Sequence, residues 1–472
     1  MNTFADAIQN RVARTENGMK ARATTGKACL DLFYTIGASR GKNIIPQFVA
    51  AYVESREVAL RIALWARDVR GGAGERQLFR DILKYLENVN PDDAISLMYK
   101  TPLVGRWDDL LVFDGEVLRN EAYNLITVAL SKGDKLCAKW MPRKGNIAVN
   151  LRNYIGLSPK EYRKTLVSLT SVVETPMCAK EWDGINFNHV PSLAAARYRK
   201  AFTRNTVKYA EYVAALKKGD PVAKVNVGAV YPYDVLKSLL DYDYSIPVLS
   251  STELEFINAQ WNAMPNLVGD NKVLPMIDVS GSMSCPAGGS KTLACMDVAV
   301  SLGLYCASKN TGAFKDVFLT FSEYPFLVKV AGEITQKLDQ IKRSQWGMNT
   351  DLHAAINSIL QTAVSANVPQ EQMPDMLVIF SDMQFDRCVR FDDSAVQMMQ
   401  RKYESAGYKM PKIVFWNLNA YSNVPVKSTE SGIALVSGFS PSLMTSLLSG
   451  NLDEFTPEAV MLKTVMVERY NF

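Results

Sequence analysis

Histidine is almost missing from this 472-residue sequence, which contains only His189 and His353. Two histidines are too few for a histidine-rich zinc cluster, and a Ser-His-Asp triad would have to use one of these two residues. The seven cysteines are scattered, odd in number and without Cys-x-x-Cys spacing, a pattern typical of a reducing compartment. We expect a cytoplasmic protein that is not an enzyme of these familiar kinds.

Long hydrophobic runs are also missing. The first ten residues include an acidic residue and lack the apolar core of a signal peptide, and no run approaches the roughly 18 apolar residues of a membrane span. We therefore expect neither secretion by a standard signal nor membrane insertion. With 48% hydrophobic and 21% charged residues, the composition is that of a globular protein, long enough for two or three domains at about 100–200 residues each.

Charge divides the chain into two unequal parts. Up to Pro265 there are 36 Lys and Arg against 28 Asp and Glu, an excess of 8 cations; after Pro265 there are 17 against 20, an excess of 3 anions. This asymmetry suggests a first part that faces polyanions and a second part that is neutral or attracts cations. We place the domain boundary here, with domains over residues 1–265 and 266–472.

The first domain has amphipathic segments of helical period, broken by Gly, Pro and Asn, and little strand alternation. Helical hairpins of about 40 residues each would stack into an α-solenoid with room for about six pairs. An irregular helical domain is the alternative, because no repeat consensus is visible.

The second domain alternates short apolar runs with helical stretches, which predicts a doubly wound α/β domain with a mostly parallel sheet. Residues 326–330 predict a short antiparallel edge strand. The expected strands are Val273–Val279, Asp316–Phe321, Met376–Phe380, Ile413–Trp416 and Ile433–Val436.

Oxygen-bearing side chains occur at three strand ends or loops of this domain, where open α/β sheets bind ligands. Oxygen ligands without nitrogen or sulfur suit a hard divalent cation, Mg²⁺ or Mn²⁺. Taken singly, Thr350 and Asp382 are equally explained as helix caps. The candidate ligands are Asp278, Ser280, Ser282, Thr350 and Asp382.

The most basic stretch of the first domain is residues 132–204, in which aromatic residues are interleaved with Lys and Arg. Such side chains neutralise phosphates and stack on unpaired bases. The alternative is a solvated helix face with tryptophans in the core. The Arg-rich turn at residues 67–76 has a similar alternative, a helix end followed by a helix start.

The metal-ligand set resembles the metal-ion-dependent adhesion site of von Willebrand factor A domains. That resemblance implies that Ser280, Ser282 and Thr350 coordinate a metal directly or nearly so, and that Asp278 and Asp382 do so directly or through water. It further implies that a partner protein supplies a carboxylate to the metal and that the site binds without catalysis.

A helical first domain of this size, followed by a second domain with an intact adhesion site, resembles the Ro ribonucleoprotein, or TROVE-domain, group. The segments Ala66–Arg76, Gly105–Asp109 and Ala138–Lys144 look closest to the members of that group without an assigned function. Val190–Ser192, Val414–Asn417 and Val436–Ser440 resemble the members of that group without an assigned function most closely. The resemblance implies HEAT-like helical hairpins in a ring or horseshoe closed by the A-domain. It also implies that small structured or misfolded RNA binds outside the ring while single-stranded 3′ ends enter the hole.

We therefore expect a non-enzymatic RNA-binding protein whose second domain holds Mg²⁺ or Mn²⁺ for a partner. Two alternatives stay open: a metal-dependent protein-interaction scaffold that does not bind RNA, and a metal nuclease with further carboxylates near Asp278 and Asp382. The candidate RNA contacts are Arg67, Arg70, Arg76, Arg106, Lys139, Arg143, Lys144, Arg197, Arg199 and Lys200.

Overall fold

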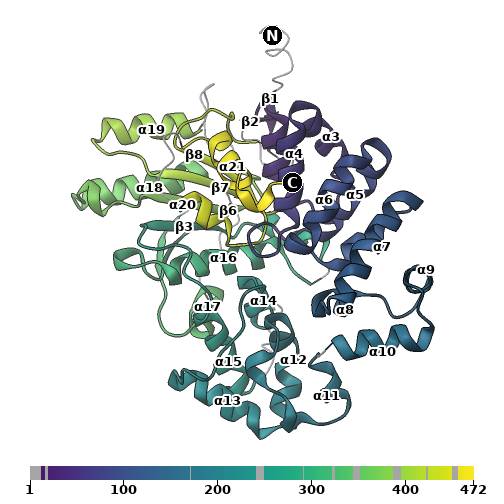
Figure 1. The fold of residues 1–472 in the computed structure, drawn as a ribbon. Coiled ribbons are helices and arrows are strands. Elements are labelled where there is room, and N and C mark those ends of the chain that lie inside the picture. The colour runs from purple at the N-terminus through teal and green to yellow at the C-terminus, as the bar shows by residue number, and fades with distance from the viewer. Residues whose placement is uncertain are drawn as a thin grey trace.

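The computed structural model describes residues 12–15, 20–170, 172–240, 249–290, 292–321, 325–343, 351–385, 395–420, 424–448 and 455–472. Helices make up most of the chain to residue 262, and a six-stranded sheet follows from residue 273 (Figure 1). None of the helices in these described ranges combines the length and the hydropathy needed to span a lipid bilayer.

The first part is built from amphipathic helices that pack against their neighbours in sequence, as α2 does on α3 and α5 on α6. Figure 1 shows them following an arc from α2 through α7 and α10 to α13. The helices are α2 (Ala28–Ile36), α3 (Ile45–Glu54), α4 (Arg56–Arg67), α5 (Arg76–Val89), α6 (Pro91–Val104), η1 (Trp107–Val112), α7 (Glu116–Ser131), α8 (Lys135–Trp140), α9 (Asn146–Ile155), α10 (Pro159–Leu169), α11 (Glu174–Cys178), η2 (Trp182–Gly184), η3 (Phe187–His189), α12 (Ser192–Asn205), α13 (Val207–Lys218), α14 (Pro232–Leu236), η4 (Lys237–Leu239) and α15 (Ser251–Asn262).

A short antiparallel pair precedes these helices. β1 (Val12–Arg14) pairs with β2 (Lys20–Arg22), and Arg22 bridges to Val424 in the second part of the chain. The sequence pattern did not predict this pair, because strands of three residues are too short to show alternation.

The sheet has the order β5-β4-β3-β6-β7-β8. All neighbours are parallel except β4 and β5, so the expectation of a mostly parallel sheet with an antiparallel edge strand is confirmed. The strands are β3 (Val273–Asp278), β4 (Val317–Phe321), β5 (Leu327–Lys329), β6 (Met376–Ser381), β7 (Lys412–Asn417) and β8 (Ile433–Ser437). The helices that follow β3 are α16 (Cys295–Lys309), α17 (Ile334–Lys342), α18 (Leu352–Ser365), α19 (Ala395–Ser405), α20 (Leu443–Leu448) and α21 (Pro457–Val465), with short turns η5 (Gly281–Ser284), η6 (Ala287–Gly289), η7 (Gly312–Phe314), η8 (Gln370–Gln372) and η9 (Glu468–Tyr470).

Alternate residues of each strand enter two different cores, because successive side chains point to opposite faces of a sheet. Leu274 and Met276 pack with the apolar faces of α18 and α19. Val273 and Ile277 pack with α16 in a second core, which continues without a break into α2–α8. The helical part and the sheet are therefore joined by a shared hydrophobic core.

The end of α2 sits directly on the carboxyl ends of β7 and β8. The last carbonyls of a helix lack partners within the helix; here Ser437 Oγ donates to Phe33 O at 2.9 Å and Asn417 Nδ2 donates to Tyr34 O at 3.3 Å. Gly37 N donates to Ser437 Oγ at 3.1 Å. A Cβ at Gly37 would lie 2.5 Å from Ser437 O, so only glycine allows this approach.

A second joint is formed by the carboxylate of Asp68, which follows α4 and is fully buried. Arg469 and Tyr470, 401 and 402 residues later, both bond to it: Arg469 Nη2 donates at 3.0 Å and the Tyr470 hydroxyl at 3.2 Å. The main chain of the turn after Asp68 approaches α4 so closely that a Cβ at Gly72 would lie 1.8 Å from Trp65 O. This turn at residues 68–75, which we call the Gly-rich turn, thus lets the chain fold back on α4.

We expect Asp68→Ala to lower the free energy of unfolding by about 2–4 kcal/mol, since the change leaves buried donors without their acceptor. Urea unfolding monitored by circular dichroism measures this. Asp114→Ala is the matched control, because its exposed ion pair with Lys84 is worth about 0–1 kcal/mol. Equal losses for the two variants would contradict the structural role of Asp68.

Candidate functional site

The order of the strands reverses between β3 and β6. The chain runs from β3 outward to β5, and then from β6 outward in the other direction to β8. Ligands of doubly wound sheets bind in the crevice outside the carboxyl ends of the strands at this switch point. Asp278 ends β3 and Asp382 directly follows β6, so both aspartates lie at the switch point.

The carboxylate of Asp278 is completely buried and held from two sides. Its Oδ1 accepts from Ser280 N at 3.0 Å, and its Oδ2 accepts from Ser381 Oγ at 2.6 Å. Burial, and then the negative charge of Asp382, raise the pKa of Asp278 to about 7, while the bonds from Ser381 and Ser280 oppose the rise. Two buried carboxylates therefore repel each other here, a repulsion that a bound cation would relieve.

Two hydroxyls follow Asp278 in the turn that leads into η5. Ser280 Oγ lies 3.0 Å from Ser282 Oγ, with Ser280 buried and Ser282 half-buried. The Asp-x-Ser-x-Ser spacing brings these three side chains together because the chain turns sharply after the strand.

Asp382 is completely buried as well. Its backbone N–H donates to Met283 Sδ at 3.2 Å, and its Oδ1 accepts from Gln384 N at 3.2 Å. Met383 has φ of +67°, which is uncommon outside glycine, so the chain is strained at the position that turns Asp382 into the edge of the sheet. Such strain is frequent at functional sites.

The residues at the switch point fit a hard divalent cation, because every donor is an oxygen and two of them are carboxylates. Asp278, Ser280, Ser282 and Asp382 could hold it. Within the described ranges, no three His, Cys, Asp or Glu side chains gather as metal ligands, and at the switch point the two carboxylates are accompanied by two hydroxyls. Thr350, the fifth candidate ligand, lies outside the described residues.

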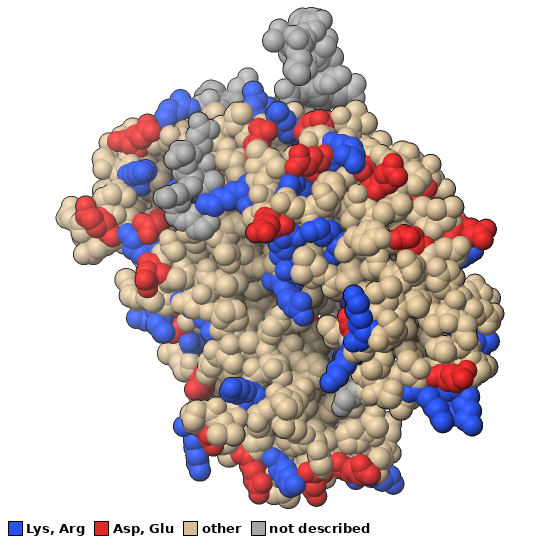
Figure 2. Space-filling model, in the orientation of Figure 1, with Lys and Arg blue, Asp and Glu red and all other residues tan. Residues whose placement is uncertain are grey.

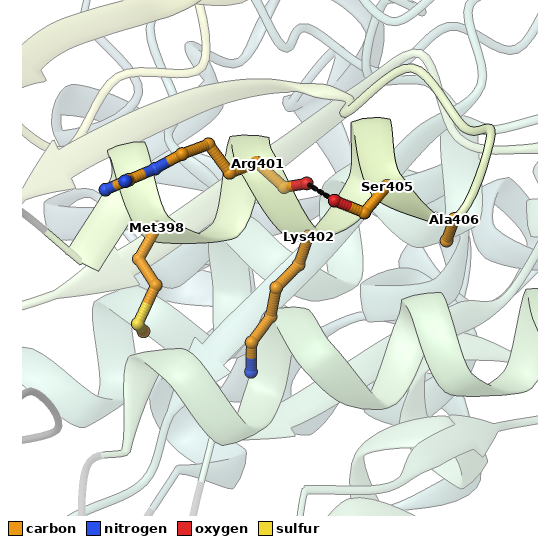
Figure 3. A pocket seen from close by; sticks show the side chains of 5 residues that line it. All are labelled: Met398, Arg401, Lys402, Ser405 and Ala406. Carbon is orange, nitrogen blue, oxygen red and sulfur yellow. Dashed lines mark hydrogen bonds between the residues drawn. The ribbon is translucent and has the colours of Figure 1, made fainter.

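Residues behind the expected Thr350 loop have structural roles. Asp351 caps α18 by accepting from Ala354 N at 2.8 Å. His353 Nε2 lies 2.8 Å from Lys402 Nζ of α19, and burial followed by the charge of Lys402 lowers the pKa of the imidazole. Lys402 also lines an open pocket of about 490 Å³ on α19, together with Met398, Arg401, Ser405 and Ala406 (Figure 3).

Two of the candidate RNA contacts are buried, which corrects their expected role. Arg67 is 3% exposed and forms an ion pair with the fully buried Asp109 at 2.6 Å. Arg199 is 8% exposed, and its Nη1 donates to Ala196 O at 2.9 Å. Both guanidinium groups serve the interior of the helical part and are unavailable to a surface ligand.

The remaining candidates are accessible at separate places. Arg70 is exposed in the Gly-rich turn, and Arg197 and Lys200 are exposed on α12, which packs on α13, α14 and α15. Arg143 and Lys144 are exposed in the loop after α8, where Arg143 Nη2 donates to Thr170 Oγ1 at 3.1 Å.

Arg106 and Lys139 lie at the ring of Trp140, and Arg76 and Arg80 lie near Arg106; we call Arg76, Arg80, Arg106, Lys139 and Trp140 the Trp140 cluster. The guanidinium carbon of Arg106 lies 3.4 Å from the centre of the Trp140 ring, and Lys139 Nζ lies 5.5 Å from it. Burial, and then the charges of Arg106 and Arg80, lower the pKa of Arg76. Arg80 and Arg106 pair with Asp108, and Arg67 and Arg80 pair with Asp109, so three arginines share these two carboxylates.

Arg80 was not among the expected RNA contacts, although its spacing from Arg76 was a signal for it. Arg80 lies four residues after Arg76 on α5, and residues four apart share a helix face. Figure 2 shows Lys and Arg side chains around a hollow near the middle of this face, in the region where Figure 1 places α8 and α14.

These features define a two-part protein, in which a helical arc is fused to a doubly wound α/β domain with an acidic switch point. Residues 15–100 and 149–272 match the family model "Domain of unknown function (DUF2828)", and residues 272–469 match "Domain of unknown function (DUF7788)". Uncharacterized protein L728 of Acanthamoeba polyphaga mimivirus is 30% identical over 512 residues, which cover 95% of this chain and 86% of that protein. The chain belongs to the family of this viral protein.

Among solved structures, the crystal structure of the Ro (RSR) protein of Deinococcus radiodurans is similar in outline. The match covers 93% of this chain and 99% of that chain, with a TM-score of 0.40 and 14% identity.

We expect Arg67→Met to lower the free energy of unfolding by about 3–5 kcal/mol, because it leaves buried Asp109 short of a cationic partner. Arg76→Met, which removes an exposed guanidinium from the next helix, should change it by only about 0.5 kcal/mol. Urea unfolding of the two variants gives the comparison. If Arg67→Met left the free energy of unfolding unchanged, the buried ion pair would be contradicted and Arg67 would again count as a candidate surface cation.

Proposed function

We propose that this protein binds RNA through the Trp140 cluster and holds Mg²⁺ or Mn²⁺ at the switch point of its α/β domain, without catalysing a reaction of its own. The observation that carries the RNA proposal is the excess of cations around an aromatic ring. Arg106 and Lys139 lie at the ring of Trp140, and burial, followed by the charges of Arg106 and Arg80, lowers the pKa of Arg76. A polyanion would relieve the repulsion among these charges.

The chemistry of the cluster favours nucleic acid over a simple anion. Arginine and lysine neutralise phosphates, and a tryptophan with a guanidinium plane beside it offers surfaces on which unpaired bases stack. Asp108 and Asp109 hold Arg80 and Arg106 in place through ion pairs of 2.5–2.9 Å, so ordering these side chains costs little on binding. Single-stranded RNA ends suit such a surface better than a duplex, whose bases are stacked already.

The metal proposal rests on the oxygen donors at the switch point. Asp278, Ser280, Ser282 and Asp382 lie at neighbouring strand ends, with Thr350 as the further ligand that the resemblance to adhesion sites implies. The cation would supply an open coordination position for a carboxylate of a partner protein. The two proposed activities lie on different parts of the chain and are tested separately.

Arg76→Ala combined with Lys139→Ala should weaken binding to an RNA duplex with a single-stranded 3′ tail about tenfold or more at 0.15 M salt. The slope of log affinity against log salt should fall by about 1.4, since each single-strand phosphate contact contributes about 0.7. Fluorescence anisotropy across a salt series measures both, with a tail-less duplex of equal charge for comparison.

Arg197→Ala combined with Lys200→Ala is the matched control, because it removes the same charge from α12. The proposal would be contradicted if the tailed and tail-less duplexes bound equally well and both double variants lost the same affinity. RNA binding would then be due to general electrostatics. The protein would then be better described as a metal-dependent interaction scaffold.

Mg²⁺ should raise the midpoint of thermal unfolding of the wild type, with a stabilisation of about 2.7 kcal/mol at a concentration 100 times the Kd. Ser282→Ala and Asp382→Asn should lose most of this gain, since each removes an oxygen donor. Ser284→Ala, an exposed hydroxyl of the same turn, should retain it. The same gain in Ser282→Ala, Asp382→Asn and Ser284→Ala would show that the metal binds elsewhere.

A further inference from the structure

Two cysteines that are ten residues apart in sequence meet beside the switch point. The sulfur atoms of Cys285 and Cys295 lie 3.3 Å apart. Cys285 follows η5, and Cys295 is the first residue of α16. No motif in the sequence marks this pair, because the spacing is not that of a thioredoxin-like Cys-x-x-Cys.

A short antiparallel bridge brings the two residues together. Pro286 pairs with Ala294, Cys295 N donates to Cys285 O at 2.9 Å, and Ala287 N donates to Leu293 O at 2.8 Å. Residues opposite each other across such a ladder have Cα atoms about 5.5 Å apart, inside the range of roughly 4.4–6.8 Å that a disulfide spans. The backbone therefore already has the separation that a disulfide needs.

The surroundings of Cys285 favour attack by its sulfur. Asn419 Nδ2 donates to Cys285 Sγ at 3.1 Å. The ammonium group of Lys42 is held nearby, where it donates to Asn419 O at 2.6 Å and to Ala420 O at 3.3 Å. Amide and ammonium donors stabilise negative charge on a sulfur, and reactive cysteines occur in such partly accessible, electropositive surroundings.

The two thiols differ in access. Cys285 is half-buried, whereas Cys295 is fully buried and its Sγ lies 3.4 Å from Leu418 O. Cys285 is therefore the more accessible of the two thiols to an oxidant from solvent. This is the arrangement of an attacking cysteine with a resolving cysteine behind it.

We propose that Cys285 and Cys295 form a redox-active dithiol that closes reversibly to a disulfide by exchange with a low-molecular-weight disulfide of the glutathione type. The Cys285 sulfur bonds to one sulfur of the oxidant, whose own S–S bond breaks and releases one thiol. The Cys295 sulfur then bonds to Cys285 Sγ and displaces the second thiol. Two protein thiols are oxidised, and their two electrons and two protons convert one external disulfide into two thiols.

The disulfide between Cys285 and Cys295 would form close to the candidate metal ligands, and its formation would not require a bound metal. Cys285 N donates to Ser282 O at 3.1 Å, so a disulfide would anchor the turn that carries Ser282 to the start of α16. The disulfide itself forms whether or not a metal binds. The redox proposal therefore succeeds or fails independently of the metal proposal.

The test uses the full chain, reduced and then equilibrated without oxygen in buffers of increasing oxidised-to-reduced glutathione ratio. Free thiols are blocked with N-ethylmaleimide, and peptide mapping by mass spectrometry locates every modification. We expect the wild type to lose labelling at Cys285 and Cys295 together and to yield a linked peptide lighter by two hydrogen atoms. Reduction should restore both labels.

Variants separate the roles of the two sulfurs. Cys295→Ser should accumulate a glutathione adduct on Cys285, because the resolving thiol is gone, and Cys285→Ser should leave Cys295 reduced. Cys178→Ser, which removes an exposed thiol elsewhere, should leave the linked peptide unchanged. Full labelling of Cys285 and Cys295 at every ratio, with adducts on Cys178 alone, would overturn the proposal.

Discussion

The buried carboxylate of Asp68 is the interaction on which the arrangement of the two parts depends. It accepts from Arg469 and Tyr470, and also from Arg70 N at 3.0 Å, so one side chain ties α4, the Gly-rich turn and η9 together. The turn then places Glu75 against Arg40, with atoms 2.6 Å apart, and starts α5 with Arg76, which lies near Arg106 and Arg80. The geometry of the proposed RNA surface thus rests on an ion pair that the surface does not contain.

The α/β domain could be predicted closely because its signals are local. Short β-branched runs gave the strands within one or two residues, and the antiparallel edge was visible as an apolar segment close behind a strand. The meeting of Asp278 with Asp382 follows from the same pattern, since the carboxyl ends of neighbouring parallel strands share one edge. Thr350, the remaining ligand of the expected set, stays a prediction.

The basic surface was predicted less well, because charge composition does not show direction. Arg67 and Arg76 belong to one Arg-rich segment, yet Arg67 ends α4 on its buried side and Arg76 opens α5 on its exposed side. Which arginine is buried depends on Asp109, 42 residues after Arg67, and no local period reports that contact. The pairing of Cys285 with Cys295 was hidden for a similar reason, since it depends on a single bridge between Pro286 and Ala294.

The contact between Asp68 and Arg469 also sets an order of events during synthesis. The two residues are 401 positions apart, and a ribosome that adds about 5–20 residues per second needs roughly 20–80 s to produce the second after the first. β8, which α2 contacts, is made only near the end of that interval, and η9, which α4 contacts, is made at its end. The packing of α2 and α4 is therefore completed long after these helices have been synthesised, and their apolar faces lack those partners until then.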